Sequence, residues 1–394
     1  MQLIINETEN RNNFEPFANL HLVSELRCGA LRLFEKIEHY FNDCDIVYHC
    51  DNELLLNSFI RRENRNKNIK ENVPSLLLNS NVLIDDSSCE AIKNIMDSAS
   101  YNTIIYDSKK NIVGYYFNNF QLTDSKNIDK NEYKSASIKS ACVLNYIWDV
   151  FNIIGENIEK DWANCIDKQK FNKHIENVFI SPSASISEGV YFDTSKGTII
   201  IDSSAVIHPL CFIQGPCYIG PNTIIKAGTQ IYENCSFGPY CKAGGELEDT
   251  IFQGYSNKQH FGFLGHSFIS EWVNLGAGTT SSDLKNNYSN IVMQLSANKK
   301  IETGKRFIGS LIGDHSKTAI NTSLNTGSVV GIFSNITKSG LTDKYTPPFS
   351  WLSDKGIEKY DLHKAILTAR VVMNRRNKEL TFEEQELITT CFVK

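Results

Sequence analysis

Eleven cysteines are the most conspicuous chemical groups in this chain, because thiols can form disulfides, bind metals or act as nucleophiles. Their spacing argues against these uses, since no two of them are arranged as Cys-x-x-Cys, a spacing typical of metal and redox sites. Four of them instead occupy one row of a six-residue pattern: Cys211, Cys217, Cys235 and Cys241. We interpret these four as small apolar residues of a repeat.

The repeat itself is clearest in the apolar residues that recur every six places. These are Ile201, Ile207, Ile213, Ile219, Ile225, Ile231, Phe237 and Ala243. A small residue stands four places after each of the first seven, and Gly, Pro and Asn lie between. A period of six fits neither a helix nor simple strand alternation. It predicts short strands wound around a triangular prism, with the aliphatic residues inside and about three hexads per turn.

The pattern is expected to slip after residue 250, where the segment YSNKQHFG reads as an insertion between coils. It resumes at Ile269 and again at Ile312. Since each coil buries its interior only against its neighbours, the two ends of the coil need covers.

The whole chain is therefore expected to form three parts. Residues 1–170 alternate apolar runs with helical stretches, which predicts an α/β domain with a mainly parallel open sheet. Residues 171–345 contain the repeat, and residues 346–394 predict two covering helices, the second with a capping box at Thr381.

Composition limits the partners. The net charge is −5 and no long basic run occurs, so nucleic acid is not an expected partner. No stretch reaches the roughly 18 apolar residues of a membrane span, and the N-terminus does not resemble a signal peptide. We expect a cytoplasmic protein. Four basic residues, Arg370, Arg375, Arg376 and Lys378, could bind an acyl-CoA phosphate, but a solvated helix face is the favoured interpretation.

Several segments spread over the chain carry a family resemblance. They are VSELRCGALRLFEKI, YIWDVFNIIGENI, SNKQHFGFLGH, WVNLGAGTTSSDLKNNYSNI, GDHSKTAINTSLNTGSVVG and YTPPFSW. Together they resemble the GlmU-like family, which joins N-acetylglucosamine-1-phosphate uridylyltransferase to glucosamine-1-phosphate N-acetyltransferase, and in particular its compact bacterial branch. The resemblance implies an α/β nucleotidyltransferase-like domain followed by a left-handed parallel β-helix and C-terminal helices.

For the coil, the resemblance implies acyl transfer from acetyl-CoA to an amino sugar 1-phosphate. It places His260 as the general base that takes a proton from the attacking amine, and a solvated loop histidine is the alternative. The implied substrate-binding residues are Lys226, Asn274 and Lys258. Ala277 and Gly278 would contact acyl-CoA, although small residues also recur at coil corners as scaffold.

Two departures from the family pattern bear on the acceptor. Phe263 stands where the family has a tyrosine, and Glu248 stands where a lysine would hold the phosphate. An acid repels a phosphate, so the acceptor could differ. His266 and His315 are further candidates for lining the groove.

For the first domain, the resemblance implies nucleotidyl transfer, but the glycine loop of the family is missing from I-N-E-T-E-N-R. The candidate nucleotide-binding residues are Arg11, Arg27, Gly29 and Lys36. Lys36 alternatively belongs to a solvated helix face. The strand ends offer Asn79 and Asn81 where an acidic metal ligand would be useful, so Mg²⁺ is expected only if this domain is active, and no metal-binding residues are predicted.

Three functions remain open. The favoured one is an enzyme of sugar-nucleotide biosynthesis that acetylates an amino sugar phosphate in the coil, with nucleotidyl transfer as a possible companion. The second is a sugar-1-phosphate nucleotidyltransferase, using UTP or dTTP, whose coil is structural. The third is a non-catalytic trimeric scaffold. The resemblance also implies a homotrimer with sites between subunits.

Overall fold

The computed structural model describes residues 1–125 and 132–393. The chain divides into two compact units. The first consists of residues 1–14, 20–26 and 31–147, and the second of residues 15–19, 27–30 and 148–394. Residues 148–170, which we expected in the first domain, therefore belong to the second unit. No helix among the described residues has the length and apolar character needed to cross a membrane.

The first unit is built on a six-stranded sheet with the order β2-β1-β3-β6-β5-β7. Its strands are β1 (Gln2–Asn6), β2 (Asp45–His49), β3 (Ser75–Asn79), β5 (Thr103–Asp107), β6 (Ile112–Phe117) and β7 (Lys134–Ile138). Strand β1 is parallel to β2 and β3, whereas β6 is antiparallel to both of its neighbours. The sheet is thus mixed. Its antiparallel pairs come from the hairpin β5–β6, which was not anticipated from the sequence.

Among its described residues this unit also contains three α-helices, short 3-10 helices and a two-stranded sheet. The α-helices and the short strands are α1 (Leu33–Tyr40), α2 (Glu53–Glu63), α3 (Asp86–Ser98), β4 (Val82–Leu83) and β8 (Cys142–Val143). Helix α1 begins only at Leu33. The segment before it includes Gly29, whose φ of +89° lies in the left-handed region and interrupts helical geometry.

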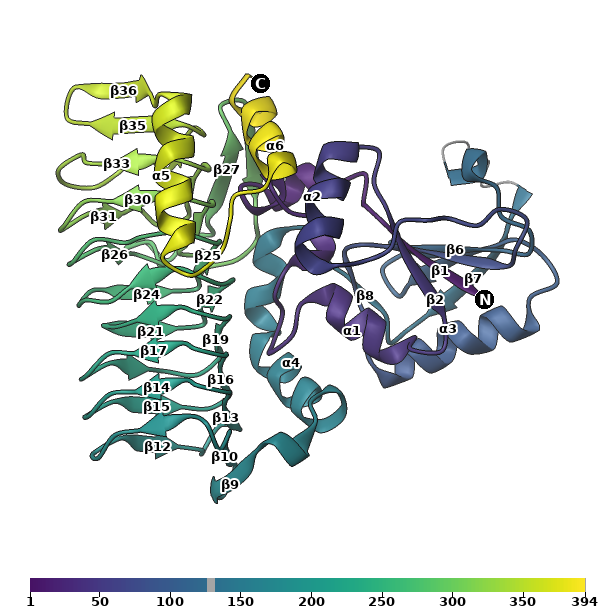
Figure 1. The fold of residues 1–394 in the computed structure, drawn as a ribbon, viewed down its shortest axis with the longest axis horizontal. Coiled ribbons are helices and arrows are strands. Elements are labelled where there is room, and N and C mark those ends of the chain that lie inside the picture. Colours follow the sequence, from purple (N-terminus) through teal and green to yellow (C-terminus); the bar gives the residue numbers. More distant parts are fainter. Residues whose placement is uncertain (126–131, 394) are drawn as a thin grey trace. The chain divides into compact units, whose positions relative to one another are not determined.

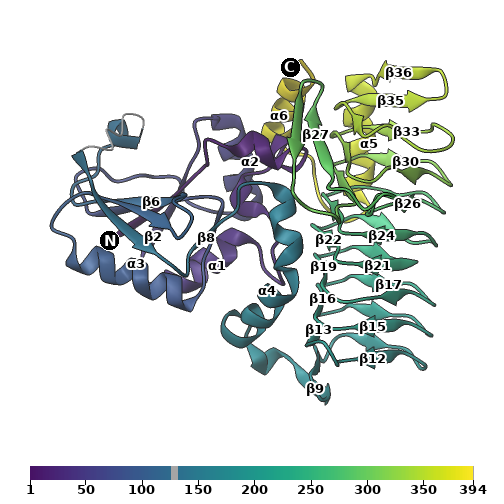
Figure 2. The same cartoon turned by 180° about the vertical axis from the view of Figure 1, so that it is seen from behind.

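The second unit contains the predicted left-handed parallel β-helix (Figure 1, Figure 2). The coil has three faces, and residues eighteen apart pair in parallel, as Ile201 does with Ile219 and Ile207 with Ile225. The eight predicted interior residues each have 0% exposure, and Cys211, Cys217, Cys235 and Cys241 are buried in the wall. Both predictions are confirmed. Stacking of coils hides the aliphatic row from water, which is the main stabilising contribution to such a fold.

The first face carries β9 (Asn172–Ile175), β10 (Val178–Ile180), β13 (Ile199–Ile201), β16 (Cys217–Ile219), β19 (Cys235–Phe237), β22 (Ile251–Phe252), β25 (Phe268–Ile269), β29 (Ser310–Ile312), β32 (Ser328–Val330) and β34 (Tyr345–Thr346). The second face carries β11 (Ser185–Ile186), β14 (Val206–Ile207), β17 (Ile224–Ile225), β20 (Lys242–Ala243), β23 (Asn257–Lys258), β30 (Lys317–Thr318), β33 (Asn335–Ile336), β35 (Ser350–Ser353) and β36 (Gly356–Lys359). The third face carries β12 (Tyr191–Asp193), β15 (Phe212–Gln214), β18 (Gln230–Ile231), β21 (Glu246–Glu248), β24 (Phe263–Gly265), β26 (Thr280–Ser281) and β31 (Ser323–Leu324).

The phase slip of the repeat differs from our prediction. Ala243 pairs with Ile225 and Leu247 with Ile231, so two neighbouring interior positions are only four places apart at this turn instead of six. The segment YSNKQHFG is not an insertion, because its residues Asn257 and Lys258 form strand β23 in register with β20. The slip is therefore a shortening that begins at Ala243. A real insertion occurs later, as the hairpin of β27 (Val292–Ser296) and β28 (Lys299–Glu302).

Three helices complete the second unit: α4 (Ile154–Lys160), α5 (Leu362–Asn374) and α6 (Phe382–Val393). Helix α5 lies along the coil (Figure 1) and buries Ala365, Ala369 and Met373. The predicted capping box of α6 is confirmed, since Glu384 N–H donates to Thr381 Oγ1 at 3.2 Å and Thr381 N–H donates to Glu384 Oε2 at 2.9 Å.

Candidate functional site

The predicted coil residues meet along one edge of the prism, which we call the His260 edge. It consists of the turns that lead from the second face to the third, at residues 208–211, 226–229, 244–245, 259–262, 276–279 and 319–322. Hydrogen bonds connect successive turns: Lys226 N–H donates to the Ala243 carbonyl at 2.8 Å, and Gly278 N–H donates to the Phe261 carbonyl at 3.2 Å. The edge thus brings Lys226, His260, Ala277 and Gly278 into one column.

His260 is exposed, and its ring makes no hydrogen bond or ion pair with any other described residue. The neighbouring Phe261 is 69% exposed. An imidazole in this position is accessible to a substrate and keeps both ring nitrogens available. Such a group can take a proton from an attacking amine.

Lys258 does not lie at the surface of this edge. It is 1% exposed and occupies the interior row of the second face, in register with Ala243. Its Nζ donates to the carbonyls of His260 at 2.8 Å and Gly244 at 3.1 Å. Burial lowers the pKa of Lys258 to about 8. The expectation that Lys258 binds substrate is corrected: in this structure its ammonium contacts the backbone of the His260 turn instead.

The shortened turn explains how a lysine fits inside the prism. Gly244 and Gly245 replace the longer turn of the preceding coil, and a Cβ at Gly245 would lie 2.8 Å from Lys258 Nζ. Gly245 also has a φ of +87°. The glycine therefore supplies both the left-handed backbone and the space that the buried ammonium occupies. The sequence signal for this was the loss of two residues between Ala243 and Leu247.

The turn predicted to contact acyl-CoA, at Ala277 and Gly278, offers a ligand mainly backbone atoms. Gly278 has a φ of +74°, and a Cβ there would lie 2.3 Å from Asn321 Oδ1, so the turn permits only glycine without rearrangement. Asn274 is exposed on the second face, bridged to Asn257 on one side and Lys317 on the other. It lies beside the edge and can offer its amide to a ligand.

Cations accumulate near the lower part of this edge. Lys226 is half-buried, and the strand register places Lys242 on the next coil. Partial burial, then the charges of Arg376, Arg375 and Lys226, lower the pKa of Lys242. The predicted substrate-binding residues included Lys226 but not Lys242, and a solvated helix face was the favoured interpretation of the two arginines.

The two departures from the family pattern lie on the third face. Glu248 pairs with Gly265 and Phe263 pairs with Glu246, so both belong to strands rather than to the turns of the His260 edge. Burial, and then Asp249 and Glu233, raise the pKa of Glu248. The acid expected to repel the acceptor phosphate therefore belongs to an acidic group on a different side of the coil.

His266 and His315 are engaged in structural contacts. His266 Nδ1 lies 2.9 Å from Asp283 Oδ2 and its Nε2 lies 3.5 Å from Asp249 Oδ2. Burial lowers the pKa of His266, but these carboxylates outweigh it and the net pKa is raised. His315 is 4% exposed and stacks between Trp272 and Phe333. Neither lines the His260 edge.

A second candidate site lies in the first unit, at the carboxyl ends of β1 and β3, where ligands of open α/β sheets bind. A cavity of about 440 Å³ is lined mostly by polar side chains: Asn6, Thr8, Glu9, Asn10, Asn79, Asn81, Lys110, Asn111, Tyr115 and Asn145. Asn81 is 3% exposed, and its Oδ1 has no hydrogen-bond partner among the described residues. Lys110 and Asn111 come from the β5–β6 hairpin and were therefore missed from the sequence.

Charged groups beside this cavity neutralise one another. Burial raises the pKa of Glu7 to about 7, although Arg11, whose Nε lies 3.6 Å from Glu7 Oε1, opposes the rise. Glu7 also accepts hydrogen bonds from Val23 N–H at 3.1 and 3.2 Å. Arg11, predicted to contact nucleotide, thus has a carboxylate beside it.

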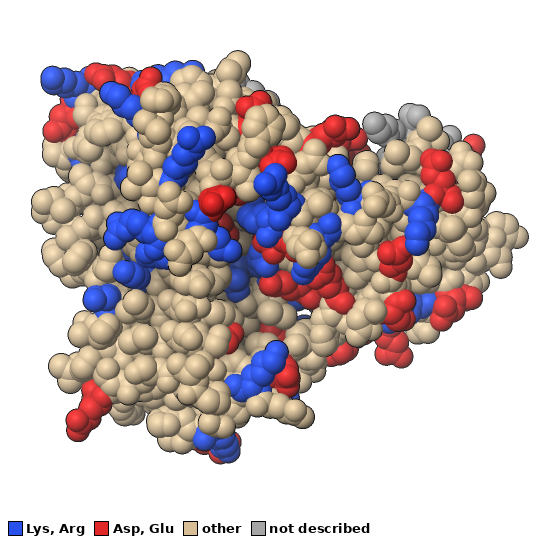
Figure 3. All heavy atoms as spheres, viewed as in Figure 1, with Lys and Arg blue, Asp and Glu red and all other residues tan. Residues whose placement is uncertain are grey.

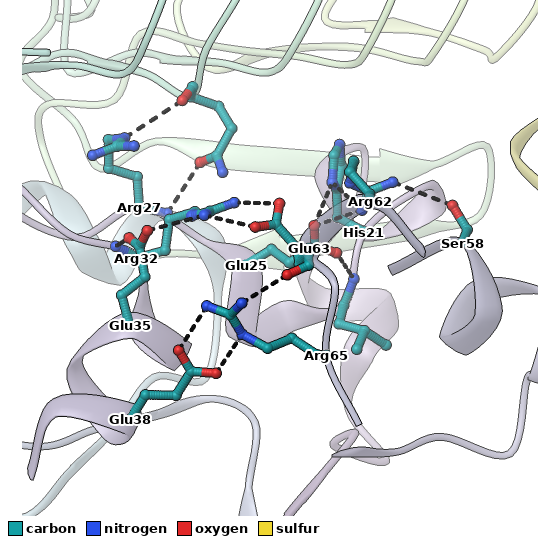
Figure 4. A network of polar contacts seen from close by, with 12 residues as sticks. His21, Glu25, Arg27, Arg32, Glu35, Glu38, Ser58, Arg62, Glu63 and Arg65 are labelled. Atoms are coloured by element: carbon teal, nitrogen blue, oxygen red, sulfur yellow. Dashed lines mark hydrogen bonds and ion pairs between the residues drawn. The ribbon is translucent and has the colours of Figure 1, made fainter. Parts of the chain in front are cut away.

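The same internal pairing extends through the first unit (Figure 4). Although burial opposes it, Arg62 and His21 lower the pKa of Glu25 to about 2, with Arg62 Nη2 lying 2.5 Å from Glu25 Oε2. Arg32 pairs with Glu63 at 2.7 Å, and Arg65 pairs with Glu38 at 2.6 Å. Paired cations of this kind stabilise the local structure and are not available to a phosphate without breaking an ion pair.

Three of the predicted nucleotide-binding residues, Arg27, Gly29 and Lys36, do not line this cavity. Arg27 belongs to the second unit, where its N–H donates to Gln253 Oε1 at 3.0 Å and its guanidinium lies 5.8 Å from the Tyr218 ring. The Gly29 carbonyl accepts from Ser236 Oγ at 2.6 Å. Lys36 is 1% exposed inside the first unit, so neither the phosphate contact nor the solvated face was right. The structure gives Arg27 and Gly29 the role of attaching their segment to the coil.

The cavity does not fit a Mg²⁺ site. A hard divalent cation prefers carboxylate oxygens, and Glu9 is the one carboxylate among the described lining residues. No group of three or more His, Cys, Asp or Glu side chains among the described residues is placed to hold a metal.

Comparisons with known proteins agree with the resemblance. Residues 3–170 match the family described as "Sugar nucleotidyl transferase". A bifunctional sugar-1-phosphate nucleotidylyltransferase/acetyltransferase from Sulfurisphaera tokodaii is 26% identical over 230 residues, which are 57% of this chain and 52% of that relative. The bifunctional protein GlmU from Wigglesworthia glossinidia brevipalpis is 26% identical over 274 residues, covering 58% of this chain and 56% of that protein. The chain spans about half the length of the curated relatives it matches.

A solved structure of the Francisella novicida UDP-N-acetylglucosamine acyltransferase is 14% identical and covers 54% of this chain and 75% of that chain. Its TM-score is 0.20, which supports no statement about function. The resemblance to the GlmU-like proteins rests on the family match and on the two sequence relatives, and it is confirmed.

Proposed function

We propose that this chain, whose residues 3–170 match the sugar nucleotidyl transferase family, transfers an acetyl group from acetyl-CoA to the amine of an amino sugar 1-phosphate at the His260 edge. One observation carries the proposal: an exposed, unengaged imidazole lies in the same column as the glycine turn at Ala277–Gly278 and a cation at Lys226. The relatives described as bifunctional nucleotidylyltransferase/acetyltransferases supply the reaction class.

In this reaction the amine nitrogen attacks the thioester carbonyl carbon. The C–N bond forms, the C–S bond breaks, and coenzyme A leaves as a thiolate. His260 accepts the proton that the amine loses and can return it to the departing sulfur. Lys226 holds the phosphate of the acceptor, and Asn274 contacts the sugar. The Ala277–Gly278 turn allows close approach of acyl-CoA because it has no bulky side chain.

Lys258 acts as a positioning residue in this account. Its Nζ binds the carbonyl of His260 and the carbonyl of Gly244 on the preceding coil, so it fixes the turn from which the imidazole projects. A buried charge–dipole contact of this kind stabilises one loop conformation more strongly than a solvent-exposed contact does.

We also propose that the active form is a homotrimer with the His260 edge at the subunit boundary. Three large apolar side chains are exposed along this edge: Leu210 at 73%, Phe261 at 69% and Ile320 at 70%. A column of exposed apolar residues supports burial against another copy of the chain. Sedimentation of the protein as a monomer would contradict this assembly.

The experiment uses acetyl-CoA and glucosamine 1-phosphate, with thiol release followed in time and the product mass measured. His260→Ala tests the base. His208→Ala is the matched control, because His208 lies on the same edge at the turn that follows β14, below Lys226. We expect His260→Ala to lose the activity and His208→Ala to keep it. Thiol release that survives His260→Ala would remove the base from the mechanism.

A second candidate function is nucleotidyl transfer in the first unit. The family match over residues 3–170 and the cavity at the strand ends favour it. The paired arginines and the asparagine lining count against it, since phosphoryl transfer depends on fixed cations and a metal. It is tested by measuring pyrophosphate released from UTP or dTTP with sugar 1-phosphates and Mg²⁺.

A further inference from the structure

We propose that Lys226, Lys242, Arg375 and Arg376 form a phosphate-binding site on the second face of the coil, beyond the end of helix α5. Lys242, Arg375 and Arg376 lie outside the turn that carries His260. The site extends the proposed function, but it is defined by binding and can exist whether or not the chain transfers acetyl groups.

The coil fixes two of the four cations. Lys242 lies on strand β20, which pairs with β17, and Lys226 follows β17 directly. The two lysines therefore project from neighbouring coils, at the second face and its adjoining edge. Both are half-buried, so their ammonium groups reach the surface from a fixed backbone.

Helix α5 supplies the other two. It packs Ala369 and Met373 inward and ends at Asn374, directly before Arg375 and Arg376. The chain then turns at Asn377, whose φ is +54°, and Lys378 Nζ reaches a point 6.0 Å from the Tyr255 ring. The end of the helix is thus held against the coil. The register of β17 and β20 brings Lys226 and Lys242 to neighbouring turns, and the contact of Lys378 with Tyr255 holds the end of the helix, with both arginines, against the same part of the coil. In agreement with this placement, the charges of Arg376, Arg375 and Lys226 contribute to lowering the pKa of Lys242.

No acid balances this cluster. Among the described residues, none of these four side chains forms an ion pair with Asp or Glu. Elsewhere on the β-helix, in contrast, Lys196 is paired with Glu233. Figure 3 shows Lys and Arg side chains gathered on the coil around the lower end of α5. Four neighbouring cations without counter-charges repel one another, and a bound phosphate removes that repulsion.

An aromatic ring adjoins the cluster. At the corner before Lys242, Tyr240 stacks on Tyr255 at 5.5 Å and an interplanar angle of 7°, and Tyr255 stacks on Trp272 at 4.3 Å. The stack ends at Tyr240, because the residue below it at this corner is Asn222. A flat base could continue the stack on Tyr240 while its phosphates reach Lys242 and Arg376.

The phosphate could come from the nucleotide part of coenzyme A or from the sugar phosphate. Titration calorimetry at low salt with pyrophosphate, adenosine 3′,5′-bisphosphate and glucosamine 1-phosphate separates these sources. Tighter binding of the bisphosphate than of pyrophosphate, lost in Tyr240→Ala, identifies a nucleotide. Tighter binding of the sugar phosphate identifies the acceptor. Either outcome supports the site.

The variants are Lys242→Gln and the double substitution Arg375→Gln/Arg376→Gln. The loss of one charge-assisted contact weakens binding by about tenfold or more, so we expect the double variant, which loses two, to bind about a hundredfold more weakly or worse. Arg370→Gln is the matched control, because Arg370 lies on the same helix and donates to Gln385. We expect it to bind within about twofold of the wild type, by the small contribution of exposed pairs.

Two outcomes overturn the proposal. The first is that the wild type binds none of the three phosphates. The second is that both charge variants bind as tightly as the wild type, in which case the arginines only compensate the carbonyls at the end of α5. The failure of acetyl transfer would leave these measurements unaffected.

Discussion

The two candidate sites of this chain treat charge in opposite ways. In the first unit, Arg11, Arg62 and Arg32 each lie beside a carboxylate, and the cavity at the strand ends is lined mainly by asparagines. On the coil, His260 is exposed and unengaged, and Lys226 and Lys242 have no acidic partner among the described residues.

This difference indicates where an anionic ligand can bind without displacing a carboxylate. An ion pair inside the first unit stabilises structure at the cost of a free cation, and binding a phosphate there would first require that pair to separate. In the coil, the strands of successive turns satisfy one another's backbone hydrogen bonds, and mostly aliphatic residues fill the interior. Lys226 and Lys242 on its surface are free for a ligand, whereas Lys196 is paired with Glu233.

The largest expected effect separates the two sites in the acetyl transfer assay. His260→Ala should lower kcat by roughly 10²–10⁴-fold, the usual contribution of a general base. Asn79→Ala and Asn111→Ala in the cavity should leave kcat within about twofold, because neither residue belongs to the coil. Equal losses of kcat in the cavity variants would contradict the assignment of acetyl transfer to the coil.

The second prediction concerns the buried cation of the coil. The pKa of Lys258 falls from 10.5 to about 8 on folding, so between these values the unfolded chain binds more protons. The free energy of unfolding should therefore rise by up to about 3 kcal/mol from pH 8 to 10.5, at 1.36 kcal/mol per pKa unit. Lys258→Met should lack this rise. Denaturant titrations of both proteins across this range measure the difference, and parallel curves would show that Lys258 is not buried as a charge.

The third prediction is that the free energy of unfolding of the first unit depends on pH in the opposite direction. Burial raises the pKa of Glu7 from 4.5 to about 7, so the stability that this group contributes is present below pH 4.5 and lost as the pH rises through 7. Unfolding of this unit should become easier by at most about 3 kcal/mol across that range, and Glu7→Gln should remove the dependence. Hydrogen exchange of β1 amides against pH, in both proteins, follows the unit directly. A pH dependence that persists in Glu7→Gln would assign it to another group.

The smallest effect compares two glycines of the His260 edge. Gly278 and Gly228 have φ of +74° and +72°, so an alanine at either is strained by about 1 kcal/mol. A Cβ at Gly278 meets Asn321 Oδ1 at 2.3 Å, whereas a Cβ at Gly228 meets nothing within 4 Å. We expect Gly278→Ala to reduce acetyl transfer by about tenfold and Gly228→Ala to affect only Tm, since displacement of a site by an ångström has such consequences. Equal activity in both variants would remove the turn from the site.

The sequence predicted the coil well because its physics is local and periodic. Every apolar residue six apart from Ile201 to Ala243 reached the interior, and the four cysteines reached the wall. The shortening at Ala243 was misplaced, because a missing turn residue leaves no residue type to recognise. The burial of Lys258 followed from that shortening and was missed with it.

The candidate sites were predicted unevenly for a similar reason. His260, Lys226 and Gly278 were assigned through a motif, and the coil register then brought them together. Arg27 and Gly29 were assigned by analogy along the chain, but their partners Gln253 and Ser236 are more than two hundred residues away. Contacts at such separations, including the cluster around Lys242, carry no local sequence signal.

The most direct test of the central claim is the initial rate of acetyl transfer for the wild type, for His260→Ala and for His260→Ala with added imidazole. Because His260 is exposed, free imidazole can reach the space that the substitution leaves. We predict that the variant is inactive and that imidazole restores part of the rate in proportion to its concentration. A His260→Ala protein that transfers acetyl groups at the wild-type rate would contradict the account.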